Sequence, residues 1–349
     1  MRLRALVAPV FACALFSSAA PSRAEPSDVV AGHAVVAGHA VAFVKVRLGA
    51  VRIRIGLAGG RPGRVEPLSE IARRFGAFVA IDGGAYEAYG NDVVRNPNHT
   101  LISGGELTFK GDIGDVLYFD ADNNAAIERI PLRIEGALDG SYGWPNNWFA
   151  YWINRYPPGR SNTITIFTPV WGERTGLGGG PQMQVADGVV TAINDSSTII
   201  PRHGYVIYFR GERAAASHFR VGRRAAYRIV RSDGQPLGAF ARAREAIGSG
   251  PRLVTAGRVT VDPAAEGFRD PKILVASAAR SIVGLSRDGW LIMATSSGTT
   301  RQMAEVALGL GAYQAMLLDG GASSGLWYRG RYVTVPGRPL SNALLVLPN

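Results

Sequence analysis

Apolar and polar side chains alternate along residues 41–55, and this two-residue period predicts β-structure. Glycines and a proline at residues 59–63 interrupt the alternation. The spacing then changes, because residues 67–74 predict a short helix whose apolar face is made of Leu68, Ile71, Ala72 and Phe75. The first part of the chain therefore predicts strands followed by a helix.

The middle of the chain predicts mostly strands and loops. Residues 164–172, 205–211 and 219–230 are rich in residue types that favour strands. The 44 glycines of the chain require many tight turns, which favours sheets over helical bundles. No linker, low-complexity stretch or block of charge divides the chain. We therefore expect an α+β fold with mixed, largely antiparallel β-sheets, a few short helices and a single domain over residues 25–349.

Two segments, residues 68–86 and 303–324, share one plan. Each begins with a helical pattern, passes through Gly-Ala and an apolar strand, and ends in Asp-Gly-Gly-Ala. A general preference for Asp-Gly after strands would account for one such match, but two with the same preceding helix favour a structural repeat. We therefore expect two similar α–β units, each with an Asp-Gly-Gly turn at a strand end, and a cleft where the glycine turns meet.

Each Asp-Gly-Gly turn combines a carboxylate with exposed backbone amides. Glycine lets these amides approach an anion because it has no Cβ. Asp319 is therefore a candidate nucleophile, base or acceptor for a sugar hydroxyl, beside donors from Gly320, Gly321 and Ser323. The first turn offers a matching set, namely Asp82, Gly83, Gly84 and the ring of Tyr86 for stacking on a sugar. The alternative for either turn alone is an ordinary β-turn with a capping aspartate.

A third glycine loop and an arginine complete the candidate site. In residues 246–254 the amides of Gly248 and Gly250 are suited to a phosphate or a sugar hydroxyl. Residues 279–295 predict a β-hairpin, and Arg280 lies at its start. A guanidinium there would bind a phosphate through two hydrogen bonds.

The first 24 residues have the pattern of a secretory signal peptide. A basic head is followed by an uncharged apolar run over residues 5–20 and by small residues before position 24. The run is shorter than the about 20 residues that a membrane-spanning helix needs. We therefore expect a secreted or periplasmic protein that loses residues 1–24. The alternative, a lipoprotein acylated at Cys13, is disfavoured by the bulky Phe11.

Composition narrows the partners. Cys13 is the only cysteine, so its removal would leave no disulfide and no thiolate metal site. The formal net charge is +11 at pH 7 and comes mainly from scattered arginines, which fits either a coding bias or anionic partners such as phosphate-bearing glycans. No recognition helix or aromatic–basic motif predicts nucleic-acid binding. No second apolar run is long enough to predict a transmembrane segment.

Motifs of metal and nucleotide chemistry do not occur in the sequence. There is no HExxH, P-loop or GxSxG motif, and the five histidines lie singly. We therefore predict no metal site and no cofactor. Most of the histidines are expected to be surface or hydrogen-bonded residues, and His99 is the one to test as a proton donor.

An ordered series of motifs over residues 45–348 resembles the phosphodiester glycosidase family. AIDGGAY at 80–86 resembles the family's Asn-Gly-Gly-Phe-Phe segment, and Gly-Glu-Leu follows at 105–107. IGSGPRLVTAG at 247–257 resembles its Gly-Gly-Pro-x-Leu segment, and ARSIVGLSRDG at 279–289 its Arg-x-Ala-x-Gly hairpin. LLDGGASS at 317–324 resembles Leu-Asp-Gly-Gly-Gly-Ser, and GRPLSNALLV at 337–346 the closing Arg-x-Val-x-Asn segment.

The resemblance implies hydrolysis of the bond between the anomeric carbon of a sugar and its phosphate. Position by position, it implicates Asp82, Gly83, Gly84, Arg280, Asp319, Gly320, Gly321 and Ser323. Two residues depart from the family pattern: Asp82 stands where the family usually has Asn, and Ala322 replaces a third glycine. Asp319 or Asp82 would activate water or attack the anomeric carbon, and a separation of about 5 Å would indicate retention, about 6.5–9.5 Å inversion.

Two alternatives remain open at this point. One is a phosphodiesterase that cleaves the P–O bond with a divalent metal held by Asp82 and Asp319. The other is a non-catalytic envelope protein that binds a glycan on the same fold. The expected partner of the principal hypothesis is a sugar-phosphate or phosphoglycan substrate.

Overall fold

The computed structural model describes residues 28–89, 94–159, 161–211 and 213–349, so the predicted signal peptide lies outside the described residues. Strands dominate this part of the chain, and its four α-helices are short: α1 (Leu68–Phe75), α2 (Arg213–Ala216), α3 (Pro271–Leu274) and α4 (Thr300–Gly309). Among the paired strands of the described residues only β11 and β12 run parallel. The expectation of largely antiparallel sheets with a few short helices is confirmed.

The largest sheet has seven strands and carries α4 on one face. Its order is β1 (Val29–Val36), β2 (His39–Arg47), β21 (Trp290–Gly298), β20 (Ala278–Leu285), β22 (Gln314–Gly320), β18 (Arg252–Thr255) and β19 (Arg258–Val259). A capping box begins α4, because the Thr299 side chain accepts from Gln302 N while the Gln302 side chain accepts from Thr299 N. Apolar residues of α4 such as Met303 and Val306 then pack on the sheet.

A five-stranded sheet carries α1 in the same way. Its order is β24 (Arg331–Thr334), β23 (Leu326–Tyr328), β4 (Val79–Asp82), β25 (Asn342–Pro348) and β3 (Val51–Leu57). The helix buries Leu68, Ile71 and Ala72 against this sheet and ends at Gly76, which has φ 67°. The predicted helix over residues 67–74 is confirmed with a shift of one residue.

A third sheet closes a common core with the first two. Its order is β6 (Glu106–Phe109), β5 (Leu101–Ser103), β17 (Glu245–Ser249), β7 (Asp115–Phe119) and β8 (Ala125–Glu128). One apolar cluster contains residues of all three sheets, for example Val46, Ile81 and Leu117. Burial of this apolar cluster is the main stabilisation of the three packed sheets.

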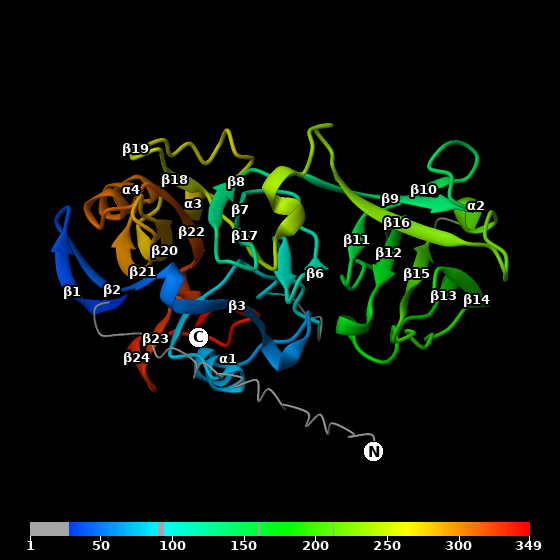
Figure 1. Ribbon diagram of the computed structural model, residues 1–349, viewed down its shortest axis with the longest axis horizontal. Helices are drawn as coiled ribbons and strands as arrows, with labels where there is room; N and C mark the ends of the chain where they lie inside the picture. Colours follow the sequence, from blue (N-terminus) through cyan, green and yellow to red (C-terminus); the bar gives the residue numbers. More distant parts are fainter. Residues whose placement is uncertain (1–27, 90–93, 160, 212) are drawn as a thin grey trace, which may run out of the picture.

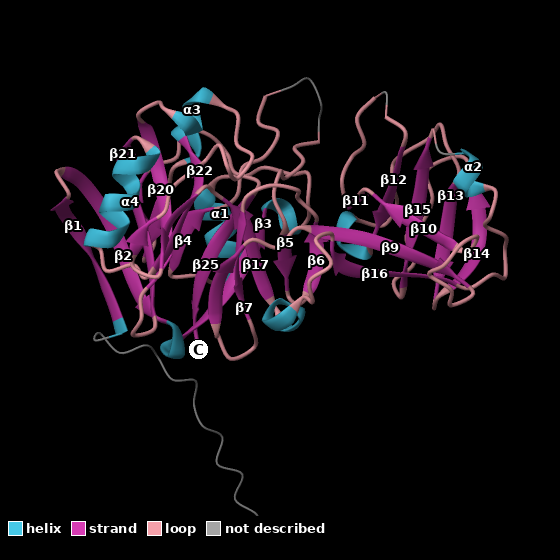
Figure 2. Ribbon diagram, turned by 90° about the horizontal axis from the view of Figure 1, so that it is seen from above, coloured by secondary structure: helices cyan, strands magenta, loops and turns pink. Residues whose placement is uncertain are grey.

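Two further sheets form a second group, seen on the right of Figure 1 and Figure 2. One has the order β10 (Asn147–Ala150), β9 (Leu132–Leu138) and β16 (Ala225–Arg231). The other has the order β11 (Trp152–Ile153), β12 (Thr163–Phe167), β15 (Gly204–Arg210), β13 (Gln182–Ala186) and β14 (Val189–Asn194). These sheets share their own apolar cluster, so the expectation of a single domain stays a prediction.

The predicted α–β repeat has the expected geometry. The first unit runs from α1 through Gly76 into β4 and ends at Asp82, and the second runs from α4 through Gly311 into β22. Because β4 and β22 lie in the two sheets that share the common core, their ends meet at one place. No helix among the described residues is long and apolar enough to cross a membrane.

Candidate functional site

The two Asp-Gly-Gly turns lie against each other. The amide of Asp319 donates to the carbonyl of Gly83 at 2.8 Å, and the charge of Asp319 acts on the pKa of Asp82. Thus residues 82–84 and 319–321, far apart in the sequence, form one structural unit.

Asp319 is the half-buried carboxylate of this unit. Its Oδ1 accepts from the amide of Gly320 at 2.9 Å, and its Oδ2 lies 3.4 Å from Nη2 of Arg338. Gly321, which follows Gly320 in the turn, is exposed and has φ 62°, a conformation that favours glycine. The carboxylate is therefore fixed on one side by its own turn and paired on the other with a cation.

Arg338 is held in place by its neighbours. Its Nε donates to Ser323 Oγ at 2.7 Å, and its guanidinium lies 5.3 Å from the ring centres of both Tyr86 and Tyr89. Nη1 of Arg338 is buried and has no hydrogen-bond partner among the described residues. A buried donor of this kind favours an anionic ligand, since an oxygen atom brought within reach would satisfy it.

Tyr86 and Ser323 therefore have roles other than those predicted. The hydroxyl of Tyr86 donates to the carbonyl of Pro339 at 2.5 Å, and its mostly buried ring faces Arg338. Ser323 is fully buried, and its hydroxyl accepts from Arg338. Both residues position the arginine, which leaves the exposed ring of Tyr89 as the aromatic surface nearest to the guanidinium.

Asp82 is completely buried at the end of β4. Its Oδ1 accepts from the hydroxyl of Ser281 and, at 2.9 Å, from the amide of Gly325, whereas its Oδ2 has no partner among the described residues. Burial raises the pKa of Asp82 well above its usual value, and the two hydrogen bonds oppose this shift. A fully buried carboxyl group with a raised pKa does not have the access to substrate that the predicted nucleophile or base requires.

The amides of Gly83 and Gly84 do not form the predicted anion-binding loop. Gly83 N donates to the carbonyl of Asn342 at 3.1 Å, and Gly84 N to Asn342 Oδ1 at 2.9 Å. A Cβ on Gly83 would lie 2.0 Å from Asn342 Oδ1, and one on Gly84 would lie 2.5 Å from the carbonyl oxygen of Gly248. These glycines are therefore required for close packing and their amides are bonded to Asn342, while a role of the two residues in substrate binding stays a prediction.

The third glycine loop lies beside the first. The amide of Gly248 donates to the carbonyl of Thr100 at 2.6 Å, so it is not available to a ligand as predicted. Gly250 has φ 148° and precedes a cis peptide bond to Pro251. A Cβ there would lie 3.0 Å from the ring of Phe268, so the position also requires glycine for packing.

Arg280 is buried, and most of its guanidinium is engaged. Nη2 donates to the carbonyls of Lys272 and Ala276, and Nε to the carbonyl of Gly298 at 3.4 Å. Only Nη1 remains, and it lies 3.3 Å from the position of a Cβ on Gly320. The predicted two-bond contact with a phosphate is therefore not possible through Nη2, because its two hydrogens already hold α3 and the following turn.

His99 lies beside the two Asp-Gly-Gly turns. Its Nδ1 donates to the carbonyl of Ile113 at 3.1 Å, which leaves Nε2 of the neutral ring as an acceptor. Burial lowers the pKa of His99, while the bond to Ile113 and the charge of Asp319 oppose the shift. No described residue hydrogen-bonds Nε2, and the charge of Asp319 acts on the pKa of the ring. This geometry fits a proton acceptor rather than the donor suggested by the sequence.

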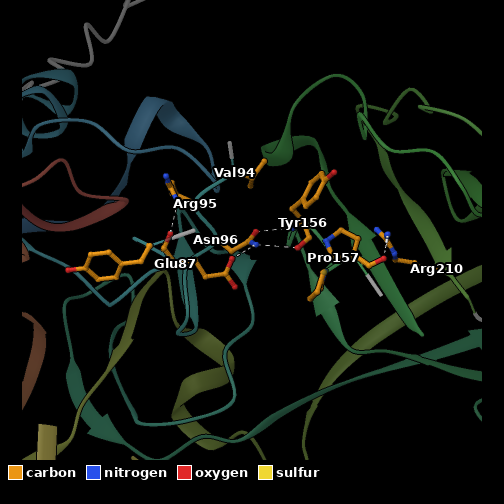
Figure 3. Close-up of a pocket in the computed structure, with 10 residues that line it drawn as sticks. Glu87, Val94, Arg95, Asn96, Tyr156, Pro157 and Arg210 are labelled. Atoms are coloured by element: carbon orange, nitrogen blue, oxygen red, sulfur yellow. Dashed lines mark hydrogen bonds between the residues drawn. The ribbon is translucent and has the colours of Figure 1, made fainter. Parts of the chain in front are cut away.

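A cavity of about 390 Å³ opens next to this cluster, and Figure 3 shows its lining. Tyr89, which faces Arg338, also lines the cavity. The other lining residues come from two parts of the chain: Glu87, Val94, Arg95 and Asn96 on one side, and Tyr156, Pro157, Pro158, Gly159 and Arg210 on the other. Its size is in the range of small-molecule sites in proteins.

Sequence reasoning missed Arg338, Asn342 and Tyr89. Arg338 and Asn342 lie in the closing motif at residues 337–346, so their spacing gave a signal that was not used for the site. Tyr89 has no motif of its own. Within the described ranges no group of three or more His, Cys, Asp or Glu residues is placed to hold a metal ion.

Comparison with known proteins finds a family match in the C-terminal half of the chain. Residues 179–347 match the phosphodiester glycosidase family model. The resemblance predicted from the ordered motifs is thereby confirmed over these residues, which include Arg280, Asp319 and Arg338. No curated protein matches the chain.

Two of the solved structures compared below share the fold over a longer range. A hypothetical protein from Synechocystis is 23% identical with a TM-score of 0.79, over 93% of this chain and 62% of its own length. A Burkholderia pseudomallei protein, whose name proposes that it is exported, is 20% identical with a TM-score of 0.71, over 89% and 74%. The catalytic domain of zebrafish N-acetylglucosamine-1-phosphodiester alpha-N-acetylglucosaminidase is 12% identical with a TM-score of 0.49, over 95% and 87%.

Proposed function

We propose that this protein hydrolyses the bond between the anomeric carbon of a sugar and the phosphate of a phosphodiester. The observation that carries the proposal is the pair formed by Asp319 and Arg338, with a buried guanidinium nitrogen for which the described residues offer no partner. The phosphodiester glycosidase match over residues 179–347 supports the same class of reaction.

Arg338 is the residue proposed to bind the phosphate. A phosphate monoester is a stable leaving group, so an arginine that meets its developing charge accelerates departure without protonating it. Tyr86 and Ser323 fix the guanidinium in advance, which lowers the cost of reorganisation during the reaction. Arg338 thus takes the role that the sequence analysis gave to Arg280.

Asp319 is proposed to react at the anomeric carbon, as a base that activates water or as a nucleophile. In either case the bond from the anomeric carbon to the phosphate oxygen breaks, and that oxygen keeps the electron pair. Water supplies the new hydroxyl group of the sugar, and its remaining proton goes to Asp319 or to Nε2 of His99. The anomer first formed distinguishes the two routes, since direct attack by water inverts the configuration and a covalent intermediate retains it.

The test is incubation of the purified protein with a panel of sugar 1-phosphodiesters in isotopically labelled water. The proposal predicts a free sugar and a phosphate monoester, with the label in the sugar, as mass spectrometry would show. Label in the phosphate would instead indicate cleavage of the P–O bond. Binding of every substrate without turnover would indicate a glycan-binding protein.

Two single-residue variants test whether the reaction takes place at this site. Asp319→Asn and Arg338→Ala should each lower kcat/KM by about 10²–10³-fold, the usual cost of removing a group that stabilises the transition state. Asp288→Asn is the matched control, because Asp288 lies on the hairpin turn between β20 and β21. Equal activity of Asp319→Asn and the control would remove Asp319 from the mechanism.

We also propose that residues 1–24 direct export, so that the enzyme meets envelope or extracellular phosphoglycans. The apolar run and the small residues before position 24 support this proposal. Fractionation of cells that produce the protein, with N-terminal sequencing of the product, tests it. A cytoplasmic product that still begins at Met1 would contradict it.

A further inference from the structure

Two paired backbone segments run from the proposed active site to the cavity of Figure 3. Residues 84–89 and 95–99 pair as a short ribbon, in which Ala85 O accepts from Asn98 N at 2.8 Å and Glu87 N donates to Asn96 O at 2.9 Å. Gly84 and His99 are at the end of the ribbon near Asp319, and Glu87 and Asn96 line the cavity. A substrate bound at Asp319 would therefore extend toward the cavity.

The second wall of the cavity belongs to the other group of sheets. It is made of residues 156–159 and of Arg210 at the end of β15. Asn96 connects the walls, because its Oδ1 accepts from Tyr156 N at 2.9 Å and its Nδ2 donates to Glu87 Oε2 at 2.8 Å (Figure 3). These bonds join the two walls of the cavity.

The charges around the cavity favour an anion. The carboxylate of Glu87 is paired with Arg155 at 2.7 Å and bonded by Asn96, so it contributes little negative potential. The guanidinium group of Arg210 lies in the second wall, where its Nη2 donates to the carbonyl of Gly159. Tyr89, which is 81% exposed, and Tyr156 add flat faces of the kind on which sugar rings stack.

We infer that this cavity binds the next unit of a sugar-phosphate chain, on the leaving-group side of the bond that is cleaved. A hydroxylated ring would lie against the tyrosines, and the phosphate that follows it would face Arg210. The inference rests on the proposed hydrolase function and makes it more specific, since the preferred substrate is a chain with repeated phosphates rather than a single phosphodiester.

Two synthetic substrates test the inference. One is a sugar 1-phosphate methyl ester, and the other has two sugar units and a second phosphate on the leaving-group side. Wild-type protein should have a KM at least about tenfold lower for the two-unit substrate, the usual effect of one charge-assisted hydrogen bond. Arg210→Ala should remove most of this difference. Arg202→Ala is the matched control, because exposed Arg202 lies just before β15, at the other end of the same strand.

A binding measurement separates this inference from the proposed function. The two-unit substrate is titrated calorimetrically into the Asp319→Asn variant and into the Asp319→Asn, Arg210→Ala double variant. The Kd of the single variant should be about tenfold lower than that of the double variant. This difference in Kd would support binding in the cavity even if neither substrate is hydrolysed. Absence of hydrolysis would overturn only the proposed function. Equal KM values for both substrates, or equal Kd values for the two variants, would overturn the cavity while hydrolysis stands.

Discussion

Replacing Asp82 by asparagine separates a buried structural carboxyl group from a catalytic one. The side chain is fully buried, its Oδ1 accepts two hydrogen bonds, and its Oδ2 has none among the described residues. Asparagine has the same shape, keeps the acceptor at Oδ1 and places an NH₂ group where Oδ2 lies. We therefore expect Asp82→Asn to fold and to keep kcat within about threefold, whereas loss of a catalytic acid or base costs about 10²-fold or more.

The stability of this variant relative to wild type should depend on pH. Burial raises the folded-state pKa of Asp82 above the usual value of 3.8. Below that value both states of the wild-type chain are protonated at this position. As the pH rises, the unfolded chain releases the proton first, so wild-type stability falls by up to about 1.4 kcal/mol per pH unit until the folded-state pKa is passed. Asp82→Asn lacks this loss and should gain relative stability over the same window.

Urea denaturation followed by tryptophan fluorescence, between about pH 5 and about pH 8, measures the difference. Asp120→Asn is a useful control, because hydrogen bonding by Asn124 lowers the pKa of Asp120 and its effect should be constant above the usual value. Asp82→Ala should cost about 1–3 kcal/mol for each buried donor left without a partner, Ser281 and Gly325. A difference between Asp82→Asn and wild type that does not change with pH would refute a neutral Asp82.

Three further predictions concern single positions. Arg280→Met should lower the free energy of unfolding by about 3 kcal/mol in urea, because three backbone carbonyls lose their donor; unchanged stability would contradict this role. Gly83→Ala should cost about 3 kcal/mol through overlap with Asn342, and Gly49→Ala, where a Cβ meets nothing within 4 Å, should change the melting temperature little. The burial-lowered pKa of His99 predicts that kcat/KM falls only below its usual value of 6.5, and His99→Gln should remove this acid limb; an acid limb above 6.5 would exclude His99 as the base.

Local patterns predicted most of the elements near the site. The alternation over residues 41–55 corresponds to β2 and β3, and the two helix–strand–turn segments correspond to α1 with β4 and α4 with β22. Residues 219–230 were predicted as one β-rich segment, but the strand begins only at Ala225. The preceding residues turn at Gly222, which has φ 90°, and Arg223 N bonds Arg220 O. Propensity alone did not reveal this turn.

The roles of the first Asp-Gly-Gly turn depend on contacts with residues distant in the sequence, which local patterns do not reveal. Gly83 and Gly84 have the composition of an anion-binding loop, yet their amides bind Asn342, 258 residues after Gly84. Because a glycine turn can approach either a ligand or another segment of backbone, its sequence does not distinguish the two. The same holds for Asp82, whose burial depends on Ser281 and Gly325 rather than on its neighbours in the chain.

The two arginines at the second turn show why the distinction matters for experiments. The sequence favoured Arg280 as the phosphate ligand because it begins a predicted hairpin, and in the structure it pairs with Gly320 of the second turn. Its nitrogens hold three carbonyls, and therefore a loss of activity in Arg280→Ala would report unfolding as readily as lost binding. Arg338 donates to one hydroxyl and one carboxylate and keeps a nitrogen without a partner among the described residues. Because Arg338 bonds only side chains among the described residues, Arg338→Ala is less disruptive to the backbone than Arg280→Ala, and a loss of activity in it reports on the site formed with Asp319.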